Sequence, residues 1–193
     1  MAKQLKTIKV NQLLNYVQGQ LGRPYWYGGI GEYATEDLYE KLSKRYPKYY
    51  DATKYKKGWK EDYGKKVHDC IGLIKAAVWC DGDSDGKPTG YNATQDLSAN
   101  GTYEKCVEKG PISSLPEIPG LLVWKNGHIG VYMGHGQVIE ARGHDYGVVK
   151  TVLSQRPWTN WCKYPWVDYS QPNTVNVTVI VNGKTYNGNI EEV

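Results

Sequence analysis

The chain has 193 residues, of which 40% are hydrophobic and 23% charged, and its formal net charge is +4. This length suits one domain with a short extension, and the composition is that of an ordinary globular protein rather than a fibrous or disordered one. The charge is too small to select nucleic acid over an anionic wall polymer, and no nucleic-acid-binding motif is present. No stretch is long and apolar enough for a membrane-spanning helix, so membrane insertion is not expected.

The N-terminal third is expected to be helical and rich in aromatic residues. Apolar residues fall at helical spacing over 8–21, and Pro24 follows the end of this pattern. An aromatic turn, Pro-Tyr-Trp-Tyr-Gly-Gly, occupies 24–29. The charged, Tyr-rich segment 35–66 contains a helix candidate at 36–44. Because it has few aliphatic residues, we expect it to lie over the surface rather than to form a core.

A second, more apolar helix is expected over 70–79, directly after Asp69, a residue type that caps helix N-termini. The Gly/Asp-rich loop 81–90 follows. It has acidic residues at alternate positions, as in a calcium loop, but lacks the terminal glutamate. The four cysteines form no CxxC pair, which argues against a structural zinc site. The sequence therefore predicts no metal and no other cofactor.

After a proline-rich link the pattern changes from helical to β. Short β-branched runs separated by glycines predict strands at 121–124, 128–133, 137–141 and 148–152. The tail alternates around an Asn-Gly pair over 175–189, which is typical of a β-hairpin. A lone hairpin is marginally stable in water, so it is a candidate for docking or self-association. The expected organisation is an α+β domain over 1–169, with helices packed on a small antiparallel sheet, and a linker with a hairpin tail over 170–193.

Cys70 is the candidate nucleophile because it opens the second apolar helix. A helix N-terminus favours a thiolate, and such cysteines have pKa values lowered from about 8.5 to roughly 3.5–7.5. A buried structural cysteine is the alternative interpretation. Among the four histidines, His128 is the candidate base because it opens a predicted strand. His68 lies outside the helix and is badly placed to face the thiol, while His135 and His144 lie in loops.

Glu140, in the next predicted strand, is the candidate residue to orient the imidazole. If the hairpin has an odd loop centred on Gly134, His128 and Glu140 are direct cross-strand partners with Cβ atoms about 4.5–5.5 Å apart. A two-residue turn at His135 and Gly136 would instead place Glu140 on the face opposite His128. The proposed triad therefore depends on the strand register.

Four short motifs stand in a recognisable order. The first, at 24–29, is Pro-Tyr-x-x-Gly-Gly, and the second is Asp-Cys-Ile-Gly at 69–72. The third, His-x-Gly-Val-Tyr, occupies 128–132, and Glu140 stands twelve positions after the histidine. Together, over about residues 10–168, they resemble the NlpC-type murein peptidases, a papain-like family of bacterial wall hydrolases and phage lysins.

The resemblance implies a papain-like fold and hydrolysis of an amide bond in the peptidoglycan stem peptide. It implies that Cys70, His128 and Glu140 form a catalytic triad. It also implies that Tyr25 helps to stabilise the oxyanion and that Asp69 contacts the free amine of a stem peptide. No metal takes part in this mechanism.

Trp26 and Ile71 adjoin these residues and are further candidates for substrate contact. Three features depart from the family pattern. The serine that usually follows the nucleophile is Ile71, and the third catalytic residue, often histidine, is Glu140. The segment 30–68 is also longer than usual, so it either walls the cleft or is a surface elaboration without effect on the substrate.

The expected activity is a cysteine endopeptidase that cleaves the bond between D-γ-glutamate and the following diamino acid. An N-acetylmuramoyl-L-alanine amidase is the near alternative. A cysteine acyltransferase on the same scaffold, or a non-catalytic phage-tail or wall-binding component, are the alternatives from other classes.

The N-terminus has no apolar run typical of a signal peptide. We therefore expect synthesis in the cytoplasm with free thiols, and a bridge between Cys80 and Cys106 only as a minor alternative after release. An enzyme of this kind would reach the wall by lysis, through a holin-type pore, or within a phage particle. This route favours a phage-type endolysin over a housekeeping secreted enzyme.

Overall fold

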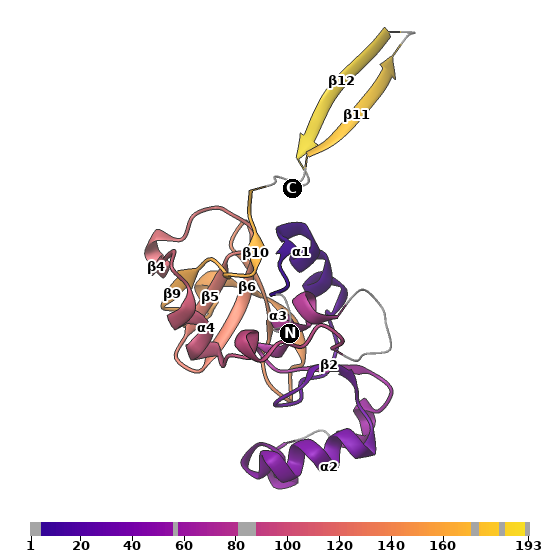
Figure 1. The fold of residues 1–193 in the computed structure, drawn as a ribbon, viewed down its shortest axis with the longest axis vertical. Helices are drawn as coiled ribbons and strands as arrows, with labels where there is room; N and C mark the ends of the chain where they lie inside the picture. The colour runs from indigo at the N-terminus through magenta and orange to yellow at the C-terminus, as the bar shows by residue number, and fades with distance from the viewer. Residues whose placement is uncertain (1–4, 56–57, 81–87, 171–173, 182–183, 192–193) are drawn as a thin grey trace.

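The computed structural model describes residues 5–55, 58–80, 88–170, 174–181 and 184–191. It is an α+β fold, the class that the sequence predicts (Figure 1). The α-helices in these ranges are α1 (Val10–Gly19), α2 (Glu36–Arg45), α3 (Gly72–Trp79) and α4 (Ala99–Lys105). The acidic residues of the calcium-like loop, from Asp81 to Asp85, lie outside the described residues.

A six-stranded antiparallel sheet forms the main body, with strand order β4-β9-β5-β6-β7-β8. Its strands are β4 (Lys109–Pro111), β5 (Leu122–Lys125), β6 (His128–Gly134), β7 (Gln137–Ala141), β8 (Val148–Val152) and β9 (Asn160–Cys162). The smaller sheets pair β1 (Ile8–Lys9) with β10 (Val167–Asp168) and β2 (Ile30–Tyr33) with β3 (Lys66–His68). The predicted strands β5 to β8 are therefore confirmed, and β9 adds an unpredicted strand between β4 and β5.

The main core lies between the helices and one face of the sheet. Leu13 and Val17 of α1 and Ile74 of α3 are fully buried against Ile129 and Val131 of β6. A second apolar cluster, which includes Tyr132, Trp158 and Trp161, covers other residues of the same sheet. The sheet is thus covered by side chains on both faces, and the start of β6 lies where helix α3 and the sheet meet.

The segment 30–68 forms a small core of its own, contrary to the expectation that it only lies over the surface. Trp26, fully buried, is surrounded by rings from this segment: Tyr39, Tyr50, Trp59 and Tyr63. Besides α2, the segment contains the short 3-10 helices η1 (Pro47–Tyr49), η2 (Ala52–Lys54) and η3 (Trp59–Asp62). The expectation failed because aromatic rings, each burying a large area, replace the missing aliphatic side chains.

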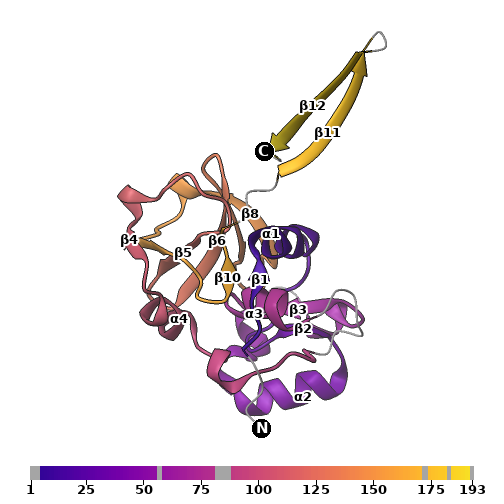
Figure 2. The same cartoon turned by 45° about the horizontal axis from the view of Figure 1, so that its top comes forward.

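The C-terminal hairpin is present as predicted, with β11 (Thr174–Val181) paired antiparallel to β12 (Lys184–Glu191). Its Asn-Gly turn lies outside the described residues. Figures 1 and 2 both show the hairpin standing clear of the main body, beyond β10. The domain boundary near residue 169 and self-association through the hairpin stay predictions.

All four cysteines are free thiols. Cys106 and Cys162 share a hydrogen bond, so the neighbour of Cys106 is Cys162 rather than Cys80, the pairing considered from the sequence. Burial and this contact raise the pKa of Cys162. Across the described ranges, no helix combines the length and apolar character needed to cross a membrane.

Candidate active site

Asp69 fixes the backbone around Cys70. Its carboxylate accepts the N–H of Gly72 (2.6 Å) through one oxygen and the N–H of Gly28 (2.8 Å) through the other. Its carbonyl accepts the N–H of Leu73. Asp69 therefore caps α3, as its residue type predicts, and also ties the glycine turn at Gly28 to the start of the helix. Both carboxylate oxygens already accept a backbone N–H, although each keeps capacity for a further bond.

Cys70 lies two residues before the first residue of α3, and it is 9% exposed. Burial raises the pKa of its thiol to about 12, with the negative charge of Asp69 contributing, while N–H groups including that of Ile129 oppose the rise. The expectation of a lowered thiol pKa is therefore wrong. The helix begins later than predicted, and Asp69 rather than the sulfur takes the N–H of Gly72.

His128 and Glu140 form a hydrogen-bonded pair. Nε2 of His128 lies 2.7 Å from Oε2 of Glu140. Glu140 therefore engages Nε2, and the second ring nitrogen, Nδ1, lies closer to the backbone of His128. The sulfur of Cys70 accepts a hydrogen bond from the N–H of Ile129, the residue directly after His128. The candidate nucleophile and the candidate base therefore converge on the first two residues of β6.

The strand register differs from both alternatives considered from the sequence. The hairpin has a two-residue turn at His135 and Gly136, because Gly134 pairs with Gln137. A β-bulge at Met133 then shifts the register by one residue. A two-residue turn alone would place Glu140 on the face opposite His128. The one-residue shift at the bulge returns Glu140 to the same face as His128.

The bulge makes His128 and Glu140 diagonal neighbours rather than direct partners. Val131 pairs with Ile139, so Gly130 lies opposite Glu140. A Cβ at Gly130 would approach the Cβ of Glu140 and a ring carbon of Trp158 to 3.2 Å each, and a methyl of Val138 to 2.9 Å. Because Gly130 of the His-x-Gly motif has no side chain, the space between His128 and Glu140 stays open for their hydrogen bond.

Glu140 is fully buried, and three side chains stabilise its charge. Besides His128, Arg156 donates from Nε (2.7 Å) and Nη2 (2.8 Å), and Thr151 donates from its hydroxyl (2.8 Å). Burial alone would raise the pKa of Glu140, but these hydrogen bonds outweigh it and lower the pKa to about 2. Glu140 is therefore ionised at neutral pH and can stabilise a protonated imidazole.

Sequence reasoning missed Arg156, Thr151 and Trp158. The ring of Trp158 stacks on that of His128, with centroids 5.4 Å apart and planes 9° apart. No motif marks these residues, because they follow η6 (Leu153–Gln155) or lie on the neighbouring strand β8. The available signal was indirect: a buried glutamate needs a cation, and Arg156 stands 16 positions further along the chain.

Tyr25 lies beside the nucleophile. It packs against the cluster that contains Cys70, and burial together with the charges of Cys70 and Asp69 raises the pKa of its hydroxyl. The hydroxyl therefore keeps its proton and is available as a hydrogen-bond donor. This position suits the oxyanion role that the resemblance implies for Tyr25.

Trp26 is wrong as a substrate contact, whereas substrate contact by Ile71 stays a prediction. Trp26 is fully buried, and its indole N–H donates to Asp62 (2.9 Å) within the aromatic core of segment 30–68. Ile71 is 6% exposed and belongs to the main core. Both are apolar residues next to chemically active ones, and the turn geometry directs their side chains inward.

The segment 30–68 contacts a residue beside Tyr25, and its effect on the substrate stays a prediction. Trp59 and Tyr55 contact the ring of His144, with centroids 3.8 and 4.7 Å away. Nδ1 of His144 in turn lies 3.3 Å from the carbonyl oxygen of Tyr25. The segment therefore joins the loop after β7 to the turn that carries Tyr25.

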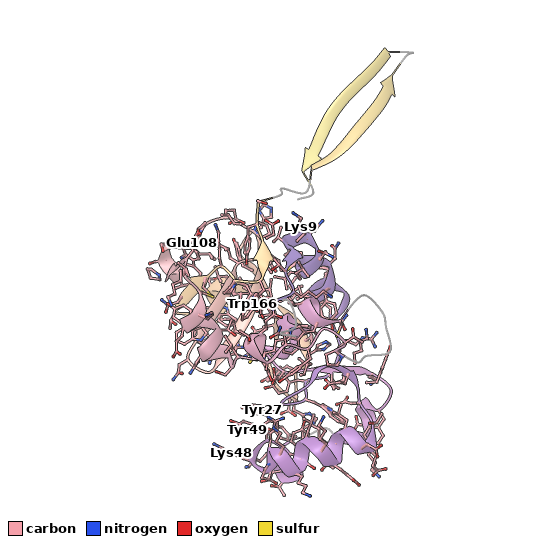
Figure 3. The ribbon with its side chains drawn as sticks, in the orientation of Figure 1. Lys9, Tyr27, Lys48, Tyr49, Glu108 and Trp166 are labelled. Atoms are coloured by element: carbon pink, nitrogen blue, oxygen red, sulfur yellow. The ribbon has the colours of Figure 1, made fainter. Side chains whose placement is uncertain are left out.

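A stacked tyrosine pair also lies near the nucleophile. Tyr27 and Tyr49 have parallel rings 3.6 Å apart, beside Lys48 (Figure 3). Burial and a hydrogen bond with Tyr49 raise the pKa of Tyr27, and the charges of Asp69 and Cys70 contribute to this rise. This pair places part of the segment within electrostatic range of the candidate nucleophile.

Within the described residues, no group of three or more His, Cys, Asp and Glu side chains could hold a metal ion. The remaining histidines have other surroundings. His68 is fully buried, accepts or donates one hydrogen bond with the hydroxyl of Tyr16 (2.9 Å), and burial lowers its pKa to about 3. His135 occupies the β6–β7 turn with a φ of 49°.

No protein-family profile matches the sequence, and no curated protein matches it. Solved structures with a similar fold include RipB, a peptidoglycan hydrolase from Mycobacterium tuberculosis, at 17% identity over 80% of this chain and 63% of that chain, with a TM-score of 0.46. This chain therefore spans just under two thirds of RipB.

Two further structures are similar to the same degree. The P60 domain of an antigen from M. avium subspecies paratuberculosis has 17% identity over 80% of this chain and 93% of that chain, with a TM-score of 0.47. NlpC1 from Trichomonas vaginalis has 16% identity over 86% and 48%, with a TM-score of 0.48. Likenesses of this degree concern the fold at most, so the site is interpreted from its own residues. The chain resembles the NlpC-type cell-wall peptidases through four motifs in order, which its fold brings together at the start of β6.

Proposed function

We propose that this protein is a cysteine peptidase that hydrolyses an amide bond of peptidoglycan. The observation that carries the proposal is the ionised, buried Glu140 paired with His128, next to the backbone N–H that binds the sulfur of Cys70. A carboxylate that orients an imidazole beside a thiol is the arrangement of a nucleophile, a base and an orienting group.

The mechanism begins from a neutral thiol, because the pKa of Cys70 is raised. As the sulfur attacks the scissile carbonyl carbon, Nδ1 of His128 takes the thiol proton, and Glu140 stabilises the resulting imidazolium. The oxyanion would accept hydrogen bonds from the Cys70 N–H and the Tyr25 hydroxyl. Removing one such donor typically lowers kcat on the order of 100–1,000-fold.

The intermediate then collapses to a thioester. The C–N bond breaks, and His128 returns the proton to the leaving amine. A water molecule, deprotonated by the same imidazole, attacks the thioester carbon, releases a carboxylic acid and regenerates the thiol. Each step uses only groups of this chain, the substrate and water.

The substrate class comes from the resemblance to the murein peptidases. It favours the bond between D-γ-glutamate and the following diamino acid, with the muramoyl-L-alanine amide as the alternative. The Asp69 carboxylate keeps acceptor capacity for a stem-peptide amine beside Cys70. We place the action of the protein at the bacterial wall after lysis, holin-type release or delivery by a phage particle.

Digestion of purified peptidoglycan tests the proposal. Native protein should release fragments that mass spectrometry identifies, whereas Cys70→Ala should release none, and a chelator should not change the native result. Cys80→Ala is the matched control, because it removes another buried thiol outside the site. A new amine on the diamino acid indicates the endopeptidase, and a new amine on L-alanine indicates the amidase. Equal digestion by native protein and Cys70→Ala would refute a cysteine peptidase.

Acyl transfer is a second candidate, favoured by the burial of Cys70 among apolar residues. Digestion with and without an added acceptor amine separates the two activities. A transferase should release little free acid in water alone and should turn over only when the amine is added, whereas a hydrolase should release the free acid without any added amine.

A further inference from the structure

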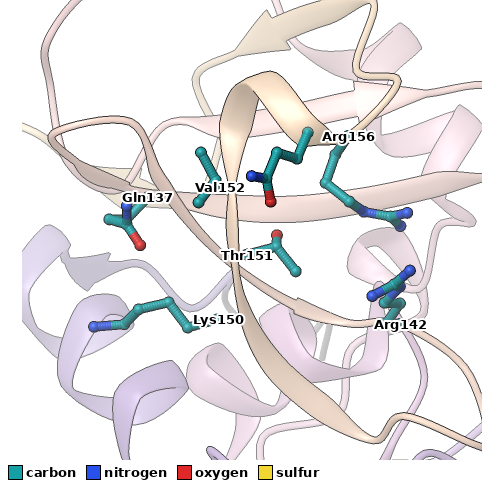
Figure 4. A pocket seen from close by; sticks show the side chains of 7 residues that line it. Gln137, Arg142, Lys150, Thr151, Val152 and Arg156 are labelled. Carbon is teal, nitrogen blue, oxygen red and sulfur yellow. The ribbon is translucent and has the colours of Figure 1, made fainter.

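A polar pocket of about 400 Å³ lies beside β8, the edge strand of the large sheet, and η6. Figure 4 shows the side chains that line it. The polar ones are Gln137, Arg142, Lys150, Thr151, Gln155 and Arg156. Three of these are cations and none is an acid, so the lining favours a negatively charged ligand.

The pocket reaches the candidate active site through two of its residues. Arg156 and Thr151 both line the pocket and both donate hydrogen bonds to Glu140. The bonds from Arg156 use Nε and Nη2, so the N–H groups of Nη1 are not engaged by Glu140. One guanidinium can therefore serve Glu140 on one side and a ligand on the other.

The charges are arranged along the pocket. Figure 4 shows the guanidinium groups of Arg142 and Arg156 at one end and the side chains of Lys150 and Gln137 at the other. The ring of Tyr146 lies 4.1 Å from the Arg142 guanidinium carbon and supports it. Glu140 compensates the charge of Arg156, but it does not line the pocket. An oxyanion between two guanidinium groups would accept charge-assisted hydrogen bonds from both.

We propose that this pocket binds an anionic group, a carboxylate or a phosphate, of the wall polymer. The two guanidinium groups would chelate the oxyanion, and Lys150 and Gln137 would bind the next polar group along the polymer. The pocket is a separate site from the one that holds the scissile bond. The choice of the wall polymer rests on the proposed function, whereas binding of an oxyanion does not.

Titration with inorganic phosphate at constant ionic strength, followed by amide NMR shifts, tests the binding. Saturable shifts should cluster at 150–156 and at Arg142. The double variant Arg142→Gln with Lys150→Gln should bind phosphate at least about tenfold more weakly, since it removes charge-assisted bonds. Neither residue takes part in the proposed chemistry.

The matched control is Lys44→Gln with Arg45→Gln on α2. It makes the same charge change and also removes an arginine that lies over a tyrosine ring, here Tyr46. It should bind phosphate as the native protein does. Shifts that do not saturate, or equal affinity in the pocket variant and the native protein, would overturn the proposal.

Wall binding then identifies the source of the anion. In a Cys70→Ala background, the pocket substitutions should weaken co-sedimentation with purified walls. A defect seen only on walls that retain phosphate polymers indicates phosphate, and a defect that persists after their removal indicates stem-peptide carboxylates. Undiminished binding to both kinds of wall would refute the wall polymer as the occupant. Because these assays need no turnover, they are independent of whether the protein proves to be a peptidase.

Discussion

Arg156→Gln removes two of the four hydrogen bonds that the Glu140 carboxylate accepts from side chains. The carboxylate is fully buried, so the loss leaves a charge with only His128 and Thr151 as partners. Breaking a buried ion pair by removing one partner typically destabilises a protein by about 3–5 kcal/mol. Since Arg156 is 17% exposed and water can partly replace it, we expect the lower end of this range.

The pH dependence gives a sharper test than the stability at one pH. The pKa of Glu140 is lowered from 4.5 to about 2. This lowering corresponds to about 3 kcal/mol of stability at neutral pH. A lowered pKa stabilises the folded state above the unfolded value, and this contribution disappears as the pH falls from about 4.5 to about 2. Arg156→Gln should therefore be much less stable than native protein at pH 7, and the two stabilities should converge toward pH 2.

Urea unfolding followed by tryptophan fluorescence at pH values from 7 to 2.5 measures this difference. Arg156→Lys should fall between the two proteins, because lysine keeps the charge but loses the planar fork. Arg45→Gln, which removes an exposed arginine on α2, should leave the curve unchanged. A stability difference between native protein and Arg156→Gln that stays constant over this pH range would refute the account of Glu140.

Three further changes test other parts of the site. Gly130→Ala should destabilise the protein by about 1–3 kcal/mol through overpacking and should impair digestion of peptidoglycan, because the added methyl meets Glu140; a thermal unfolding curve that matches the native one would contradict this. Alkylation of Cys70 by iodoacetamide, followed by peptide mass spectrometry, should be slow at pH 7 and accelerate with pH beyond 9, because the raised pKa leaves little thiolate; a rate that reaches a plateau below pH 8 would show a lowered pKa instead. Trp26→Phe should destabilise the protein by about 1–3 kcal/mol by removing the indole donor from Asp62, as chemical denaturation would show, and an unchanged midpoint would argue against this buried bond.

The helix α2 shows what local sequence was sufficient to predict. The expected range 36–44 ends one residue before the observed end at Arg45. Thr35 caps it by accepting the N–H of Leu38, and acidic residues begin the helix while basic ones end it. These signals act within one or two helical turns, so they can be recognised in the sequence without knowledge of the fold. The same holds for strands β5 to β8, which are separated from one another by turns that contain glycine.

The order of the motifs also predicted which residues come together at the start of β6. The contacts between Gly28 and Asp69, between Cys70 and Ile129, and between His128 and Glu140 join segments up to 59 positions apart, as from 70 to 129. The motif spacing indicated that these segments meet. It did not indicate the thiol pKa, because burial and the Asp69 charge depend on how the segments pack.

The tertiary structure alone decided the register, the partners of Glu140 and the core of segment 30–68. A bulge at Met133 has no sequence signal of its own, yet it returns Glu140 to the face of His128. Arg156 reaches Glu140 from beyond the next strand, and the rings that pack around Trp26 extend as far as Tyr63, over a 38-residue stretch from 26 to 63. Local propensity depends on neighbours along the chain, whereas these features depend on which distant side chains compete for the same buried space.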